Sequence, residues 1–266
     1  MSSRLHSAVM TRRRLTLAAV IALALTLGAC GEAVPPSETS SLDTTATDAP
    51  FEALDLRYTC GAFPFEPGLL TAGPGDDEQA DDPVAAALRA HLAGVGPDID
   101  FLPDTGWHLA GKDAQNAEFV TVGGDLGMKV VVVSNGENGS DGWKVTGWGQ
   151  CQPRLQLPAG LGSAEWAFDP AQPKPDATTQ VFDAMVTEMS CNSGQPADGR
   201  IVGPQIVRTA ETVLVIFAVR PRPGDFQTCP SNPSTRIRVD LGEPLGEREL
   251  LDGGRLPPGD PTQPRF

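Results

Sequence analysis

The sequence predicts an α+β fold rich in β-structure: one helix plus an antiparallel meander, followed by a smaller, mostly antiparallel β-unit. One segment carries apolar residues at helical spacing, whereas the other apolar runs are short and either alternate or are β-branched. Gly (29 residues) and Pro (25 residues) are frequent, and aromatic residues make up only 6% of the chain. Such a composition indicates many turns around modest hydrophobic cores.

The predicted helix begins at Asp82-Pro83, an N-cap residue followed by a proline in the first turn. We expect Gly94 to end it as the C′ residue. Its apolar face also carries a histidine, through the positions Val84, Leu88, His91 and Leu92. The acidic run that precedes it, residues 76–82, lacks the spacing of a calcium loop, so we expect a solvated loop whose last Asp caps the helix.

Four strands are predicted after the helix, at 106–110, 116–122, 128–134 and 142–148. Lys129-Val130-Val131-Val132-Val133 is apolar on both faces, which favours a central strand. In regular alternation Trp143 and Val145 share one face of the last strand, and Trp148 points to the other.

The second half of the chain has no clear helix. Residues 181–190 fit either a helical face or a strand, and the β-branched content favours a strand. A hairpin is predicted from 201–207 and 212–219, and further strands near 163–168 and at 236–241.

These patterns divide the chain into six parts. A flexible tether is indicated by the Ser, Thr and Pro content of residues 30–50. The predicted order is a signal peptide (1–29), the tether (30–50), an α+β unit (51–152), a Pro-rich connector (153–178), a β-rich unit (179–256) and a loose tail (257–266).

The N-terminal segment is built like a bacterial secretion signal, with arginines, then an apolar run, then small residues before Cys30. Leu27-Gly28-Ala29-Cys30 resembles the lipobox of bacterial lipoproteins. That resemblance implies lipidation of Cys30 and attachment to the outer face of the cell membrane. An ordinary secretion signal and a twin-arginine signal remain alternatives. The apolar run is short of the roughly 20 residues that a membrane-spanning helix needs.

Four cysteines remain after Cys30, and an even number in an exported chain favours two disulfides. Three pairings are possible. We predict Cys60–Cys151 and Cys191–Cys229, because each bridge then closes one compositional block of the chain.

The charge of the chain bears on its partners. The net charge is −14, and removal of 1–29 would leave 16 basic against 34 acidic residues, a net charge of −18. Such a surface repels phosphate backbones, so we expect no nucleic-acid partner. Membrane attachment would then depend on the lipid anchor, and the remaining partner would be an envelope protein or a small ligand.

Several cysteine- and tryptophan-containing segments carry a broader resemblance. They are Tyr58-Thr59-Cys60-Gly61, residues 143–151, Cys191-Asn192-Ser193-Gly194 with Gly199-Arg200-Ile201, residues 229–233 and residues 244–248. Together they resemble a group of actinobacterial exported lipoproteins. The resemblance implies an envelope location and paired cysteines, and it implies no particular activity.

No catalytic, metal-binding or cofactor motif stands out in the sequence. Gly-x-Ser-x-Gly, Ser-x-x-Lys and Cys-x-x-Cys are absent, so we predict no catalytic residue, no metal ligand and no cofactor. Trp148 and Trp107 are the candidates for a contact surface. The leading hypothesis is a non-catalytic lipoprotein that binds a ligand or an envelope component. The alternative is a secreted hydrolase with a dispersed site, which requires His91 or His108 beside a carboxylate and a hydroxyl.

Overall fold

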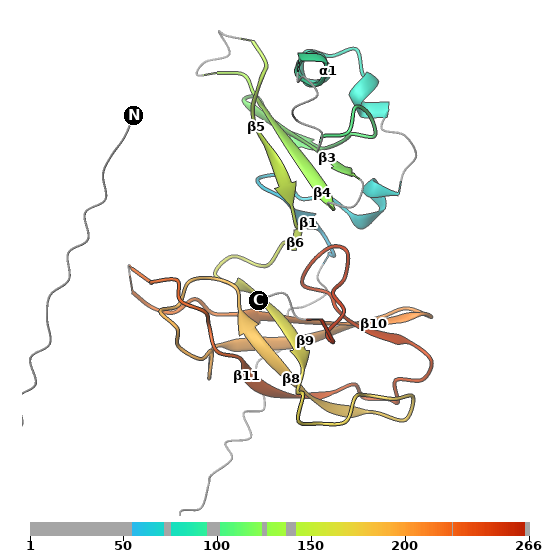
Figure 1. Cartoon of the computed structure of the whole chain (residues 1–266), viewed down its shortest axis with the longest axis vertical. Coiled ribbons are helices and arrows are strands. Elements are labelled where there is room, and N and C mark those ends of the chain that lie inside the picture. The colour runs from blue at the N-terminus through green and yellow to red at the C-terminus, as the bar shows by residue number, and fades with distance from the viewer. Residues whose placement is uncertain are drawn as a thin grey trace, which may run out of the picture. The chain divides into compact units, whose positions relative to one another are not determined.

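The computed structural model describes residues 55–71, 76–94, 102–123, 127–136, 142–224 and 226–263 (Figure 1). The predicted signal peptide (1–29), the predicted tether (30–50) and Cys30 lie outside the described residues. All described residues belong to one compact unit. It is β-rich, with one α-helix and mainly antiparallel sheets, so the predicted α+β class is confirmed.

The first sheet has four antiparallel strands in the order β2-β3-β4-β5, and helix α1 (Pro83–Gly94) packs against β4 and β5 (Figure 1). Between them lies a core that includes Leu88, Trp107, Phe119 and Val131. Strands β3 and β4 have the expected bounds, whereas β2 and β5 begin two residues later than expected. The bounds are β2 His108–Lys112, β3 Asn116–Val122, β4 Met128–Ser134 and β5 Lys144–Cys151.

The acidic run before α1 has a structural role that the sequence only partly indicated. Asp82 caps the helix as expected, since its Oδ1 accepts a hydrogen bond from the Ala85 N–H at 2.8 Å. The short 3₁₀-helix η2 (Asp76–Gln79) also binds the start of β2. Asp77 Oδ2 accepts from the Leu109 N–H at 3.0 Å, and Glu78 Oε2 accepts from the Trp107 N–H at 2.9 Å. The carboxylates thus satisfy backbone donors on an edge strand.

A β-bulge between β4 and β5 changes which face Trp148 occupies. Val133 pairs with Val145, Val132 pairs with Gly147 and Val131 pairs with Trp148, so Thr146 is the extra residue on β5. Val131 and Val133 share a face, and Trp148 and Val145 therefore share it too. The expectation that Trp148 points away from Val145 is wrong, because the bulge shifts the alternation by one residue.

The second sheet has six strands, in the order β11-β8-β7-β10-β12, with β9 paired to β10. The predicted hairpin is confirmed as β9–β10, and the ambiguous segment at 181–190 is a strand, β8. Strand β12 was not expected, and it runs parallel to β10. The bounds are β7 Gly162–Phe168, β8 Val181–Glu188, β9 Ile201–Arg208, β10 Thr212–Val219, β11 Thr235–Asp240 and β12 Glu249–Asp252.

Two segments differ from their expected roles. The connector 153–178 contains the expected strand near 163–168, β7, but this strand lies between β8 and β10 in the second sheet and so does not merely connect two units. Residues 257–263 were expected to form part of a loose tail. Instead, Gly259 and Asp252 exchange two backbone hydrogen bonds of 2.8 Å, and the Pro261 carbonyl accepts from the Phe168 N–H at 3.2 Å. The tail is held because it satisfies backbone groups at the ends of β7 and β12.

Smaller elements and two disulfides complete the unit. A third core cluster joins Val120 and Met128 of the first sheet to Ile216 of the second, through Tyr58 and Leu155. Both predicted disulfides, Cys60–Cys151 and Cys191–Cys229, are present. The remaining elements are β1 Tyr58–Thr59, β6 Arg154–Leu155 and the 3₁₀-helix η1 Pro67–Leu70.

Candidate functional site

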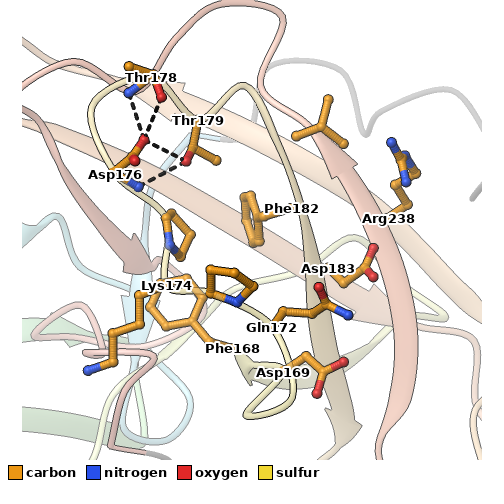
Figure 2. Close-up of a pocket in the computed structure, with 13 residues that line it drawn as sticks. Phe168, Asp169, Gln172, Lys174, Asp176, Thr178, Thr179, Phe182, Asp183 and Arg238 are labelled. Atoms are coloured by element: carbon orange, nitrogen blue, oxygen red, sulfur yellow. Dashed lines mark hydrogen bonds between the residues drawn. The ribbon is translucent and has the colours of Figure 1, made fainter.

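A pocket of about 340 Å³ lies where the loop 169–180 meets β8 and β11 (Figure 2). Phe168 is the last residue of β7 and Phe182 the second residue of β8, so the two strand ends bring both rings to the pocket. We call this the Phe182 pocket. Its other lining residues are Asp169, Gln172, Pro173, Lys174, Pro175, Asp176, Thr178, Thr179, Val181, Asp183 and Arg238.

The aromatic floor of the Phe182 pocket is held by a buried tryptophan. The Trp166 ring lies 5.4 Å from Phe168 and 5.4 Å from Phe182, and the two Phe rings are 6.1 Å apart. Trp166 is 2% exposed, and its Nε1–H donates to the Val215 carbonyl at 3.0 Å. Because Trp166 cannot rotate without losing this bond, the two partly exposed Phe rings are fixed from below.

One wall of the pocket is a tight turn closed by Asp176. Its Oδ1 accepts hydrogen bonds from the Thr178 N–H at 2.9 Å, the Thr178 hydroxyl at 2.7 Å and the Thr179 hydroxyl at 3.1 Å (Figure 2). These bonds hold the pKa of Asp176 below its ordinary value, the Thr178 hydroxyl contributing most. The turn therefore carries a carboxylate whose Oδ1 is engaged within the loop.

Other polar side chains of the lining come from β8, β11 and the loop. Arg238 of β11 pairs in register with Asp183 of β8. Within the described part of the chain, neither side chain makes a hydrogen bond or an ion pair, and the same holds for the side chains of Gln172 and Lys174. Lys174 acts electrostatically on Asp260, so Gln172, Asp183 and Arg238 are the groups available to a ligand.

Asp169 is the buried acid at the base of the pocket. It is 5% exposed, and its Oδ1 accepts from the Ala171 N–H at 2.9 Å. Its Oδ2 lies 2.6 Å from Arg236 Nη2 in an ion pair that is not aligned as a hydrogen bond. The Arg236 charge thus compensates the buried carboxylate.

A second pocket, of about 620 Å³, shares Phe168, Asp169, Gln172 and Lys174 with the first. Its remaining walls are mainly apolar and include the tail that folds back onto β7. They are Ala167, Pro170, Met185, Ser234, Pro261 and Thr262.

The two tryptophans proposed for a contact surface lie in different environments. Trp107 is fully buried, and its Nε1–H donates to the Pro103 carbonyl at 2.8 Å, so the prediction that it lies on a contact surface is wrong. It packs between α1 and the first sheet because it directly precedes the edge strand β2. Trp148 is 43% exposed, and its ring lies 4.7 Å from that of His91 on α1.

The histidines do not form the arrangement that a dispersed hydrolase site requires. His91 Nε2 is buried without a hydrogen-bond partner, and burial lowers the pKa of His91. His108 is 8% exposed on β2. Among the residues that the structure describes, neither imidazole is hydrogen-bonded to a carboxylate or a hydroxyl.

Neither a metal centre nor a membrane-spanning helix occurs among the described residues. No group of three or more His, Cys, Asp or Glu side chains there could hold a metal ion. No helix in the same part of the chain is long and apolar enough to cross a membrane.

Comparisons with known proteins add no information on this pocket. No protein-family model matches the chain, and no curated protein or solved structure matches it either.

Sequence reasoning did not find the Phe182 pocket. Phe168 and Phe182 are the only aromatic residues that bracket the Pro-rich stretch between β7 and β8. A loop bordered by aromatic residues at two adjacent strand ends is the signal that could have located it. Arg238 could not have been assigned, because its place beside Asp183 depends on the β8–β11 register.

Proposed function

We propose that this protein is an exported lipoprotein, anchored through Cys30 at the outer face of the cell membrane, that binds a ligand in the Phe182 pocket. The leader pattern and the lipobox-like Leu27-Gly28-Ala29-Cys30 support export and anchoring. The two disulfides fit an oxidising compartment outside the cytoplasm. The tether 30–50 would hold the folded unit away from the membrane.

The observation that carries the binding role is the pocket itself. It combines two partly buried Phe rings with three polar side chains, Gln172, Asp183 and Arg238, that make no hydrogen bond or ion pair in the described part of the chain. A concave site with an apolar base and a few uncommitted polar groups is typical of ligand binding. The Thr178 and Thr179 hydroxyls of its lining both bond to Asp176 within one turn, and no His or Cys lines the pocket, so binding is the function that this geometry supports best.

The anchor is tested by replacing Cys30. We expect Cys30→Ala to move the protein from the membrane fraction into the medium, because the lipid would have no attachment point. Immunoblots of cell fractions measure this. Retention of the variant on the membrane at the parent level would contradict the anchor.

The binding role is tested by crosslinking in living cells. A photoreactive amino acid in place of Lys174, which lines the pocket, is expected to give an adduct that mass spectrometry can identify. The matched control places the same group at Asp198, an exposed residue outside the pocket. Adducts that are equal at both positions, or absent at position 174, would contradict binding in the Phe182 pocket.

A further inference from the structure

The first sheet has an open edge at β5, which pairs with β4 on one side and with no described strand on the other (Figure 1). Within the described part of the chain, no backbone group outside β4 hydrogen-bonds to the backbone of residues 144–151. We propose that this edge binds a short extended segment of a partner protein, which adds to the sheet beside β5 and places large apolar side chains over Gly147 and Gly149. This surface is separate from the Phe182 pocket and does not depend on the lipid anchor.

The register of β3 and β4 shows which way the backbone groups of β4 point. In an antiparallel pair, residues whose N–H and C=O groups point to the partner strand alternate with residues whose groups point away from it. At one end of the β3–β4 ladder the Gly123 N–H donates to the Gly127 carbonyl. At the other end the Asn135 N–H donates to the Gln115 carbonyl. Both bonds indicate that the odd-numbered residues of β4 face β3, so the even-numbered residues face β5.

The pairing of β4 with β5 carries this alternation to the edge. Val130 pairs with Gly149, so the N–H and C=O groups of Gly149 point to β4. Its neighbours Trp148 and Gln150 therefore point their backbone groups away from the sheet. These two donors and two acceptors form a row that an extended polypeptide backbone matches. The open edge thus selects a β-strand as its partner.

Two features limit the open edge to a short segment. At one end, the bulge at Thr146 interrupts the ladder. At the other end, the chain continues into β6, which is already paired on both sides, with β1 and through the bridge between Arg154 and Arg255. Residues 147–151 lie between these limits and include no proline, charged side chain or bulge, the features that usually block an edge.

A second copy of this chain fits the edge less well than a short segment of another protein. The second copy would bring its whole β5, with the chain before it, along the stretch where β6 is already paired on both sides. The net charge of −14 on each copy also opposes self-association. By contrast, neither α1 nor β5 contains Asp or Glu, so this part of the surface does not repel an acidic partner.

The side chains around the edge define the kind of segment that fits. A Cβ atom added at Gly147 or Gly149 would meet nothing within 4 Å, so this face of β5 is bare. Beside the glycines lie Val130 and Val132 of β4, which are both half-buried. Large β-branched or aromatic side chains on an added strand would cover these valines, as cross-strand pairs do. On the other face, the exposed ring of Trp148 is in reach of the intervening residue of that strand.

The test uses the full-length Cys30→Ala protein and the synthetic peptide acetyl-Ser-Ile-Thr-Tyr-Thr-Ile-Ser-amide, whose apolar residues alternate. We expect this peptide to shift the amide resonances of residues 145–151 and not those of residues 168–183, which border the Phe182 pocket. The matched peptide has proline in place of both threonines, which removes two N–H donors and keeps the three apolar side chains. It should not bind.

Variants of the edge separate backbone pairing from side-chain contact. Gln150→Pro removes an N–H that points outward and none that pairs with β4, so the fold should tolerate it. It should weaken peptide binding about tenfold, whereas Gln150→Ala keeps the N–H and should bind as the parent does. Circular dichroism verifies that both variants are folded.

A second variant keeps the test decisive if Gln150→Pro does not fold. Gly149→Lys has open space for its Cβ, and its charge would face the apolar side chains of the peptide, so binding should be lost. Gly68→Lys is the matched control, because Gly68 is equally open and lies in η1, outside the edge. It should bind the peptide as the parent does.

Four outcomes would overturn the assignment of this edge to a partner segment. The alternating peptide may leave the resonances of β5 unshifted, the proline peptide may shift them equally, or the folded Gln150→Pro may bind as tightly as Gln150→Ala. The fourth is a concentration-dependent dimer in sedimentation that Gln150→Pro abolishes, because the occupant would then be a second copy. Equal loss of binding in Gly68→Lys and Gly149→Lys would contradict it as well. None of these results bears on the Phe182 pocket.

Discussion

Asp252, the last residue of β12, is 2% exposed and lies beside other charged groups. Its Oδ1 accepts from the Gly254 N–H at 2.9 Å, and its Oδ2 from the Trp166 N–H at 3.4 Å. Burial raises the pKa of Asp252 to about 7, and the Glu165 carboxylate adds to this. The two N–H groups and Arg255 act in the opposite direction. Ionising Asp252 in the folded protein is therefore unfavourable.

This residue predicts a pH dependence of stability. Because the folded pKa of about 7 exceeds the ordinary value of 3.8, the contribution of Asp252 is fully present below pH 3.8 and is lost as the pH rises through 7. In the parent, Asp252 should make the free energy of unfolding lower at pH 8 than at pH 5 by an amount on the order of 2 kcal/mol, and Asp252→Asn should remove this difference. Urea denaturation of both proteins at the two pH values measures it.

Comparing the variant with the parent separates the effect of Asp252 from that of His91, whose contribution to stability changes with pH in the opposite direction. His91 has a lowered pKa, so its contribution falls as the pH decreases, and it is the same in both proteins. An unchanged pH difference in Asp252→Asn would show that another group causes it. Burial of the Tyr58 hydroxyl raises the pKa of Tyr58 to about 12, and the Asp252 charge adds to this rise.

At the scale of single elements, the N-terminus of α1 shows most clearly how a few neighbouring residues fix where a helix begins. Asp82 caps the helix through the Ala85 N–H, and its Oδ2 lies 2.9 Å from Lys112 Nζ. The hydrogen bond from Ala85 is the largest cause of its lowered pKa. The ion pair with Lys112 is largely exposed and contributes little.

We expect Asp82→Ala to reduce the free energy of unfolding by about 1 kcal/mol, because an N–H at the helix start loses its acceptor. Asp81→Ala is the matched control, since its side chain is exposed and caps nothing in the described structure. Urea denaturation at neutral pH compares them. Equal losses in the two variants would show that acidic charge before the helix, and not the cap, is what matters.

The strands show where local patterns stop being sufficient. Asn116–Val122 and Met128–Ser134 have the expected bounds because their β-branched and alternating residues fit only a buried strand. Glu249–Asp252 has four residues and no such pattern, and it becomes a strand only by pairing with β10. The bulge at Thr146 likewise follows from the pairing of β5 with β4, and it decides the position of Trp148.

At the scale of the whole molecule, the two disulfides act on different parts of the chain. Cys60–Cys151 joins the segment after β1 to the end of β5 and closes 91 residues. Cys191–Cys229 closes 38 residues between β8 and β11. Each bridge lowers the conformational entropy of the unfolded chain, which stabilises the folded protein by about 4 kcal/mol in the chain-entropy treatment.

Replacing each pair by alanine should therefore destabilise the protein by a few kcal/mol, and the two losses should add, because the bridges share no residue and serve different sheets. Urea denaturation of the two paired variants and of the fourfold variant measures this. If the fourfold variant has the same free energy of unfolding as one of the paired variants, the two losses do not add. The two bridges would then stabilise the protein by the same restriction of the unfolded chain.

The candidate site was less predictable than the fold. Phe168, Phe182 and Arg238 stand 14 and 56 residues apart along the chain, and only the packing of β7, β8 and β11 brings them together. Trp107 and Trp148 look alike in sequence as large aromatic residues beside strands. One is buried under α1 and the other is 43% exposed, because burial depends on what covers each position.

The sequence by itself determined the features that depend on neighbouring residues: the α+β class, the capped helix at Asp82-Pro83 and the β9–β10 hairpin. It also predicts the leader and the tether on which the lipoprotein proposal rests. Spacing and turn chemistry act within a few residues, so they can be read locally. Only the tertiary structure decided the face of Trp148, the return of the tail onto β7 and the Phe182 pocket. Each of these results from pairing or packing between segments that are distant in the chain.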